Sequence, residues 1–523
     1  MTLRARALLA GLFALAAVSV GPSAVASAHA VLVGTDPGYG ATVPDAPTRV
    51  TVRFDEPVTA AGAGITVADK DGRRVDTETV SPADGGHAVV VGVRPDLPAG
   101  TYLLSWVVLS ADGHTVSGSS VFGIRVPPDL TLGDPPRDPV AVTADGVARM
   151  LTAVGYLGVV LAVGVPGVAS LGWRAGTRTA VVAQLTGIGA VTVAAVSLLA
   201  VALTPARLTG PDGWADPHAW AQVLTSSPGV AAVVRALAGA ALAAGRSRPR
   251  VVAVAGAVIV VTTAASGHAM AGAARPAALI STAVHVLAMA LWVGAVVLGV
   301  VVRWRPDRAT LLPRFGRVAA AAVAVLALTG IYQSVRSVDP AAALWTTPWG
   351  RLLLLKSALV LAAAGAVLAA RRILRGRVPH SALRLEFVLL AAVLVVTGVL
   401  AGTTPARDDY DPRVTLAADF GPARAEVTVD GAGAGEQELT VHLRDAGGTP
   451  IGASAVTGRL TRTDDAIGPI DIAFRRVEPV ELGPHYFVSQ PVRVPLAGNW
   501  QLRLTVLLDR TTGYTASVPY RVW

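Results

Sequence analysis

The sequence predicts a membrane protein with one β-domain before and one after a block of hydrophobic helices. Of its 523 residues, 52% are hydrophobic and only 15% are charged, whereas soluble globular proteins have roughly 25% charged residues. Residues 147–404 contain long apolar runs, which indicate spans of a membrane. The segments on either side alternate apolar and polar residues with the period of two that is typical of strands.

The first 28 residues have the pattern of a secretory signal peptide. Arg4 and Arg6 precede a short apolar stretch, and Ala26-Ser27-Ala28 is a small-residue cleavage site. Cleavage after Ala28 would make His29 the first residue of the mature chain. The sequence has no cysteine, which excludes disulfides and thiolate metal sites.

Residues 29–126 are predicted to form a β-sandwich or barrel. Alternating segments such as Arg49–Phe54 and Tyr102–Val108 are separated by turn sequences such as Asp112-Gly113, a spacing that favours a small antiparallel β-domain. The next segment, 127–146, begins with a stretch rich in proline and aspartate and is predicted to be a linker.

Each of the eight apolar runs in the next block approaches or exceeds the ~20 residues that cross a bilayer as a helix. The runs cover residues 147–171, 179–203, 228–244, 250–267, 277–302, 315–335, 351–370 and 384–403. Arginines are concentrated in the first, third, fifth and seventh gaps between the runs. Because cytoplasmic loops carry an excess of Lys and Arg, we expect a plasma-membrane protein whose terminal domains are both extracytoplasmic. This distribution explains the net charge of +9 without nucleic-acid binding.

Residues 405–523 alternate again in segments such as Ala425–Val429 and Trp500–Val506. The pattern predicts an extracytoplasmic domain with a small immunoglobulin-like β-sandwich fold. We expect its two histidines, His442 and His485, to lie at the surface.

An N-terminal His29 would offer one metal ion two nitrogen ligands, its α-amine and its imidazole Nδ1. Asp112 and His114 are the candidate partners, because the glycine between them lets both side chains turn toward one point. Nitrogen ligands in near-planar geometry suit Cu(II), which leads the affinity order of the first-row divalent metals. The residues alone equally allow a hairpin turn followed by a solvated histidine.

Histidine and methionine also occur together in the membrane block. His285 and Met289 lie one helical turn apart and share a face, and His285 is ~12 Å from the outer end of its span. His268 and Met270 follow the preceding span. Imidazole with thioether suits Cu(I) or Cu(II), so these four residues are a candidate copper path, with ordinary helix packing as the alternative. Two further cations lie within spans, where we expect snorkelling or helix pairing: Arg235 and Lys356.

Residues 29–126 resemble the CopC family of extracytoplasmic copper-binding proteins. The resemblance is carried by His29-Ala30, Asp36–Pro44, Val52–Val58 and Gly100–Gly118. It implies a Cu(II) site with the ligands His29, Asp112 and His114. Some members also have a methionine-rich Cu(I) site, but this domain contains no methionine, so we expect a form that binds Cu(II) alone.

The membrane block, 147–404, resembles the CopD family. The resemblance is carried by Ser266–Ala269, His285–Gly294, Arg314–Arg317, Thr329-Gly330 and Gly350–Lys356. It implies copper transport, in the direction of import, coupled to the outer Cu(II) site and serving copper homeostasis and resistance. We expect no enzymatic activity. The expected partners are copper and the lipid bilayer, with extracytoplasmic copper chaperones or a reductase as candidates, and the sequence predicts no oligomeric state.

Three other functions remain open from the sequence. A copper buffer or sensor would bind the metal without transport. A haem-bearing redox membrane protein would need axial ligands, for which only His268 and His285 are well placed. A histidine-brace copper oxygenase would need open coordination positions, part of which Asp112 would fill.

Overall fold

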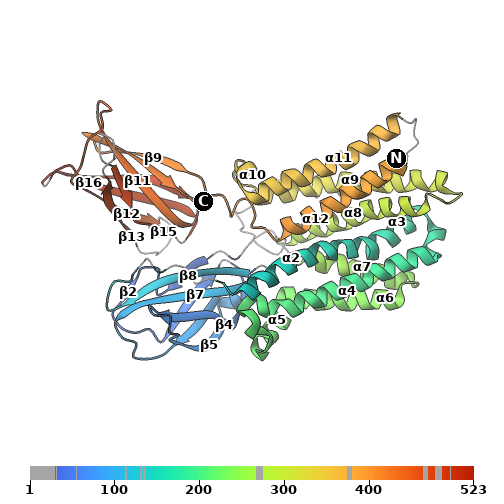
Figure 1. Ribbon diagram of the computed structural model, residues 1–523, viewed down its shortest axis with the longest axis horizontal. Helices are drawn as coiled ribbons and strands as arrows, with labels where there is room; N and C mark the ends of the chain where they lie inside the picture. The colour runs from blue at the N-terminus through green and yellow to red at the C-terminus, as the bar shows by residue number, and fades with distance from the viewer. Residues whose placement is uncertain are drawn as a thin grey trace.

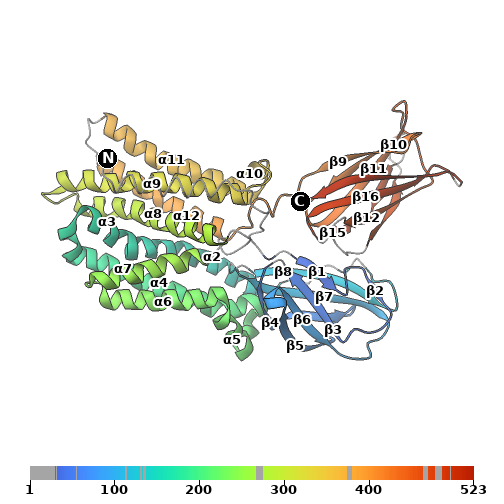
Figure 2. The same ribbon diagram turned by 180° about the vertical axis from the view of Figure 1, so that it is seen from behind.

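The computed structural model describes residues 30, 32–54, 56–111, 113, 115–129, 132, 137–266, 275–373, 380–462, 469–477, 486–494, 496–509 and 511–523. These residues form two β-domains that lie at the same end of a bundle of long helices (Figure 1 and Figure 2). The predicted signal peptide and His29 lie outside the described residues.

The N-terminal domain is a sandwich of two four-stranded sheets with the strand orders β1-β3-β6-β5 and β2-β8-β7-β4. Its elements are β1 (Leu32–Asp36), β2 (Thr42–Val43), β3 (Arg49–Phe54), β4 (Val58–Asp69), β5 (Asp76–Ala83), the short helix η1 (Asp84–Gly86), β6 (Ala88–Val93), β7 (Gly100–Ser110) and β8 (Thr115–Ile124). Alternate residues of β7, including Tyr102, Leu104 and Trp106, are buried in the core between the sheets. The sandwich predicted for this part of the chain is confirmed.

Helices form at each of the apolar ranges that the sequence predicts as spans. The helical elements are α2 (Pro139–Val159), the π-turn η2 (Val160–Gly164), α3 (Val165–Gly172), η3 (Arg174–Arg178), α4 (Ala180–Thr209), η4 (Gly210–Trp214), α5 (Pro217–Thr225), α6 (Ser227–Gly245), α7 (Pro249–Ala264), α8 (Arg275–Val302), α9 (Arg308–Ser337), α10 (Ala343–Thr346), α11 (Pro348–Ile373) and α12 (His380–Ala401). Among the described residues, 6 helices are long and apolar enough to cross a membrane, whereas Pro249–Ala264 and Val388–Ala401 are shorter apolar helices. The predicted count of eight spans is therefore not confirmed.

Helix α2 begins inside the segment 127–146 that the sequence predicts to be a linker. The Asp138 carboxylate accepts a hydrogen bond from the backbone N–H of Val140 at 2.7 Å and so caps the helix. Pro139 occupies the first position, where its missing N–H leaves no helical hydrogen bond unmade. Because Asp145 and Gly146 interrupt the apolar residues of this helix, a search for apolar runs places its start too late.

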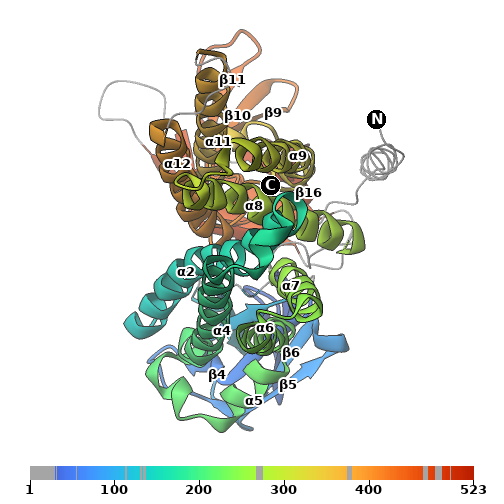
Figure 3. The ribbon, with the colours of Figure 1, turned by 90° about the vertical axis from the view of Figure 1, so that its right-hand side faces the viewer.

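Helix α8 lies in the middle of the bundle, which Figure 3 shows end-on, and it contacts α3, α7, α9 and α12. Its backbone crosses the π-turn η2 very closely. A Cβ atom on Gly164 would lie 2.0 Å from the carbonyl oxygen of Ala290, and one on Gly294 would lie 2.6 Å from the carbonyl carbon of Gly164. Two glycines at this crossing therefore hold α8 directly against the chain that continues from α2. Such π-turns are frequent at functional sites.

The C-terminal domain is an antiparallel sheet of nine strands in the order β17-β16-β12-β13-β14-β11-β10-β9, with β15 paired to β11. Its strands are β9 (Val414–Asp419), β10 (Ala423–Asp430), β11 (Gly435–Asp445), β12 (Ala455–Arg462), β13 (Ile470–Val477), β14 (Tyr486–Ser489), β15 (Val492–Val494), β16 (Gly498–Leu507) and β17 (Gly513–Val522). The end strands β9 and β17 contact each other, so the sheet curls into a barrel-like form. The all-β prediction is confirmed, but the predicted immunoglobulin-like sandwich is not, because β14 pairs with both β13 and β11 and joins the strands into one sheet.

Candidate functional site

The turn between β7 and β8 carries the predicted ligands Asp112 and His114, which themselves lie outside the described residues. Gly113 between them has a φ of +91°, which glycine adopts without steric cost. Its backbone N–H donates a hydrogen bond to the carbonyl of Ser110 at 3.0 Å. Ser110 and Gly113 thus make the hydrogen bond of a tight turn between β7 and β8, which the sequence allows with or without a metal ion.

The described start of the N-terminal domain lies at the same end of the sandwich as this turn. Leu32 of β1 pairs with Phe54, the last residue of β3. The next strand, β4, starts at Val58, which pairs with Ser110 at the edge of the turn. Ala30 is buried in the core of the same domain. This topology meets one requirement of the predicted site, namely that the start of the domain and the β7–β8 turn share one end of the sandwich.

A buried carboxylate lies beneath the turn, and sequence reasoning did not single it out. Glu56 is only 3% exposed and accepts a hydrogen bond from the hydroxyl of Ser110. A hydrogen bond of this kind fixes the base of the hairpin, since breaking it would leave a buried carboxylate short of a partner. The only hint in the sequence was the acidic pair at 55–56.

The turn also contacts the helix bundle directly. Arg207 of α4 donates a hydrogen bond to the carbonyl of Gly113 at 3.1 Å, and the hydroxyl of Thr115 donates to the carboxylate of Asp145 on α2 at 3.1 Å. Asp145 also forms ion pairs with Arg207 at 2.7 Å and with Arg137 at 2.9 Å. These contacts hold the β7–β8 turn at one place on the bundle.

Apolar packing supports the same contact between domain and bundle. Leu109, next to the turn, is 2% exposed and belongs to a buried cluster with residues of α4, α5 and α6. The other buried members of this cluster are Val201, Leu208, Ala219, Val223 and Ala232. The interface therefore has an apolar part beside its polar part, and it excludes water from one side of the turn.

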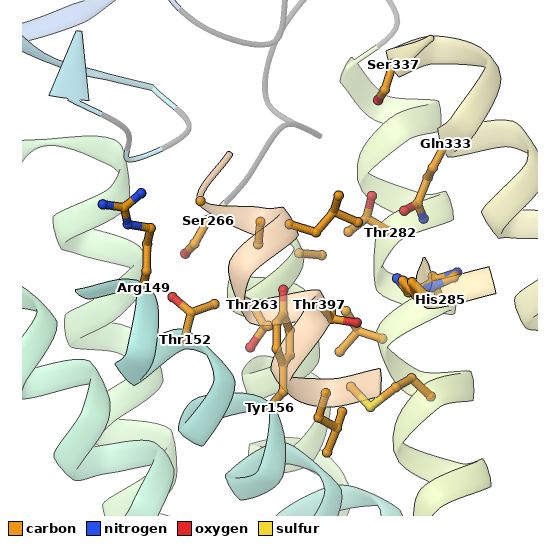
Figure 4. A pocket seen from close by; sticks show the side chains of 18 of the residues that line it. Arg149, Thr152, Tyr156, Thr263, Ser266, Thr282, His285, Gln333, Ser337 and Thr397 are labelled. Atoms are coloured by element: carbon orange, nitrogen blue, oxygen red, sulfur yellow. The ribbon is translucent and has the colours of Figure 1, made fainter. Parts of the chain in front are cut away.

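A cavity of about 1050 Å³ connects the turn to the interior of the bundle. Gly113 and Thr115 line it at the turn, and His285 and Met289 of α8 line it within the bundle. The prediction that His285 and Met289 share a face is thus confirmed. Polar side chains from several helices surround the cavity (Figure 4): Thr152, Tyr156, Thr263, Ser266, Thr282, His285, Gln333 and Thr397. His268 and Met270 lie outside the described residues.

His285 is oriented by a threonine on the neighbouring helix. Its Nδ1 lies 2.8 Å from Oγ1 of Thr329 on α9. That hydroxyl also lies 2.8 Å from the carbonyl of Val325, and when it donates its single proton there, the imidazole Nδ1–H is the donor in the pair. The lone pair of His285 is then on Nε2, and a hydrogen bond on one ring nitrogen with the other left free is the usual state of a metal-binding histidine.

The glycine that follows Thr329 lies beside the imidazole. A Cβ atom on Gly330 would make ordinary van der Waals contact with Cε1 of His285, at 3.6 Å. Thr329-Gly330 stands out as a motif in the sequence. Its contact with His285 could not be predicted, because α8 and α9 are adjacent only in the fold.

The two cations within the helices differ in their surroundings. Arg235 of α6 joins helices as expected, since it donates to the hydroxyl of Ser197 at 3.0 Å and to the carbonyl of Thr262 and the hydroxyl of Ser266, both at 2.9 Å. Lys356 of α11 instead lines the cavity, and no described residue accepts a hydrogen bond from it. The expectation of snorkelling or helix pairing is therefore met by Arg235 and not by Lys356.

The described part of the chain, which leaves out His29, Asp112 and His114, contains no cluster of three or more His, Cys, Asp or Glu residues that could hold a metal ion. His442 is exposed and stacks on Tyr486 with 5.2 Å between ring centroids. Its predicted surface position is confirmed, and His485 lies outside the described residues.

The fold is that of a protein with several apolar helices, long enough to cross a membrane, and a β-domain docked at a cavity that His285 and Met289 line. Family models of copper-resistance proteins match two parts of the chain. The family model of the CopC domain matches residues 32–125, and the family model of copper resistance protein D matches residues 309–401.

Curated relatives agree with the family models. The chain is 36% identical over 110 residues to copper resistance protein C of Xanthomonas campestris pv. juglandis, which covers 20% of this chain and 85% of that protein. It is 39% identical over 98 residues to copper transport protein CutJ of Bacillus subtilis (strain 168), a match that spans 18% of each chain. The chain belongs to the copper resistance protein C family and, in addition, carries a domain of the copper resistance protein D family.

Two solved structures are similar to the N-terminal domain in sequence. CopC from Methylosinus trichosporium OB3b is 29% identical, and the match covers 20% of this chain and 99% of that chain, with a TM-score of 0.17. PcoC, a methionine-rich copper resistance protein from Escherichia coli, is 26% identical over 18% of this chain and 98% of its own, also with a TM-score of 0.17.

Proposed function

We propose that this protein binds Cu(II) at an extracytoplasmic site and passes copper through its helix bundle into the cell. The observation that carries the proposal is the docking of the β7–β8 turn at a cavity that contains His285 and Met289. Membership of the two copper resistance families supports the choice of metal, and one relative is named a copper transport protein.

The proposed outer site consists of His29, Asp112 and His114 in a domain spanning residues 29–126, after removal of a signal peptide of residues 1–28. It is supported by the tight turn at Gly113 and by the shared end of the sandwich where β1 begins. Nitrogen and carboxylate ligands favour Cu(II) over Cu(I). Ligation by the α-amine makes the site depend on cleavage.

The proposed path begins at this site and continues to His285 and Met289, with His268 and Met270 as further candidates near its outer end. It runs through a membrane domain of eight spans, residues 147–404, which follows the linker 127–146. The position of both β-domains at one end of the bundle supports the expectation that residues 405–523 are extracytoplasmic too (Figure 1). Either Cu(I) or Cu(II) suits imidazole with thioether.

Copper accumulation in cells tests the proposal. His285→Ala removes the imidazole at the cavity, whereas His442→Ala removes an exposed histidine of the C-terminal domain and is the matched control. We expect accumulation to fall to the level of cells without the protein for His285→Ala and to remain unchanged for His442→Ala. If both variants accumulate copper like the wild type, the proposed path is wrong.

A further inference from the structure

The cavity is lined by many more cations than anions. Its described wall includes the basic side chains Arg137, Arg149, Arg207, Arg235, Arg336 and Lys356. Asp145 is the only carboxylate among the described lining residues. The wall therefore carries a strong excess of positive charge.

The carboxylate of Asp145 does not neutralise the positive charges that lie deeper in the cavity. Asp145 is engaged at the β7–β8 turn, where it forms ion pairs with Arg137 and Arg207 and accepts a hydrogen bond from Thr115. The hydrogen-bond partners of Arg235 are two hydroxyls and a backbone carbonyl, all of them uncharged.

Lys356 is the cavity cation whose lack of a described hydrogen-bond acceptor is clearest. It lines the same cavity as His285, and no described residue accepts a hydrogen bond from its Nζ. A cation inside a membrane domain is costly unless it is paired or faces a water-filled cavity that carries substrate. Lys356 has the second kind of position, so its partner should be something that enters the cavity.

This wall is a poor environment for a bare copper cation. Like charges at short range repel each other strongly where the dielectric constant is low. A copper ion that carries its own anionic ligand avoids the repulsion and supplies a counter-charge for Lys356, which pairs with no carboxylate among the described residues. Carboxylates both ligate Cu(II) and accept hydrogen bonds from Lys, Arg, Ser, Thr and Tyr, and the cavity has the size of a small-molecule site.

We propose that the cavity binds a small carboxylate anion, that Lys356 is its principal anchor, and that copper enters as a complex with such an anion. The first two statements stand without transport, whereas the third rests on the proposed function. The role of Lys356 is then to select the anionic form of the cargo while His285 offers a ligand to the metal.

Anion binding can be tested on the purified full-length protein with citrate as the probe. The sequence contains only two lysines, Lys356 and Lys70, and the side chain of Lys70 is 69% exposed on the N-terminal domain. We expect citrate to slow the modification of Lys356 by a small amine-reactive reagent, measured by peptide mass spectrometry, and to leave Lys70 unaffected. Equal rates at Lys356 with and without citrate would overturn the proposal.

Variants then test the anchor. Lys356→Met should weaken citrate binding about tenfold or more, because a hydrogen bond to a charged group is lost, and Lys356→Arg should restore much of it. Lys70→Met is the matched control and should bind citrate like the wild type. Unchanged citrate affinity in Lys356→Met would refute the assigned anchor.

Vesicles that contain the protein separate this inference from the proposed function. Uptake of labelled copper is compared between copper–citrate and copper held by a neutral chelator at the same free copper concentration. We expect faster uptake from copper–citrate, and we expect Lys356→Met to abolish the difference. Equal uptake from both would reject entry as an anionic complex and leave transport intact. No uptake from either, with citrate still protecting Lys356, would instead reject transport and leave the anion site intact.

Discussion

The orientation of His285 depends on a single hydroxyl group. Oγ1 of Thr329 lies 2.8 Å from Nδ1 of the imidazole and 2.8 Å from the carbonyl oxygen of Val325. This contact engages one ring nitrogen and leaves Nε2 for a metal ion, and outer hydrogen bonds of this kind typically change metal affinity 10- to 100-fold when they are removed.

We predict that Thr329→Val lowers copper uptake about 10- to 100-fold while the protein still folds, because valine has the same shape but no hydroxyl. Thr329→Ser should retain most of the activity. Thr192→Val is the control, since this half-buried threonine lies outside the cavity lining and hydrogen-bonds to its own helix at Ile188. Uptake by Thr329→Val equal to that of the Thr192→Val control would show that Thr329 does not position the histidine.

Gly113 is a second residue on which the proposed site depends, here through its backbone conformation. An alanine at its φ of +91° would be strained by about 1–2 kcal/mol. The strain would fall on the turn that carries two of the proposed ligands.

We therefore predict that Gly113→Ala weakens Cu(II) binding strongly. Gly72→Ala is a close control, because Gly72 also has a positive φ of +79° in a turn of the same domain, with open space around it. Both variants should lose a similar amount of thermal stability, but only Gly113→Ala should lose Cu(II) affinity in a titration. Comparable affinities in the two variants would argue against a ligand role for this turn.

At the scale of elements, the contact between the β7–β8 turn and helices α2 and α4 joins the outer domain to the bundle. Asp145 is central to it, because its carboxylate meets two arginines and a threonine and is largely buried. Removing one partner of a shielded ion pair leaves the others uncompensated, which is usually more costly than losing the pair as a whole.

Asp145→Asn should therefore loosen the N-terminal domain from the bundle without unfolding either. We expect faster hydrogen exchange in the amides around residues 109–115, and slower copper uptake. Asp212→Asn changes an exposed aspartate of η4 and should leave both measurements unchanged. Unaltered exchange in Asp145→Asn would mean that the apolar contacts at Leu109 suffice for docking.

The elements themselves were largely predictable, and their contacts were not. Alternation with period two and long apolar runs are local properties, so they located the sandwich and the helices from the sequence. The start of α2 was missed because Asp138 and Pro139 signal a helix through capping rather than hydropathy. The partnership of His285 with Thr329 joins residues 44 positions apart in the chain, and no local pattern predicts which helices will be neighbours.

At the scale of the whole molecule, the two β-domains and the bundle form one connected arrangement. Arg493 of the C-terminal domain donates a hydrogen bond to the hydroxyl of Ser119 in the N-terminal domain at 3.2 Å. The backbone N–H of Arg407 donates to the carbonyl of Ser337 at 3.0 Å, at the end of α9 that lines the cavity. The C-terminal domain thus contacts both the N-terminal domain and the wall of the cavity, a role that its sequence did not suggest.

The central claim is that copper bound by the outer domain is the copper that crosses the bundle. It can be tested by loading purified, processed protein in sealed vesicles with one equivalent of labelled Cu(II), oriented with the β-domains outside. The Cu(II) electron paramagnetic resonance signal and the label inside the vesicles are then followed together. We predict that the spectrum characteristic of Cu(II) at the outer site is lost in proportion to the label that appears inside, and that His285→Ala keeps its copper on the outer domain. Label that stays outside in the wild type, or that enters equally in His285→Ala, would contradict the claim.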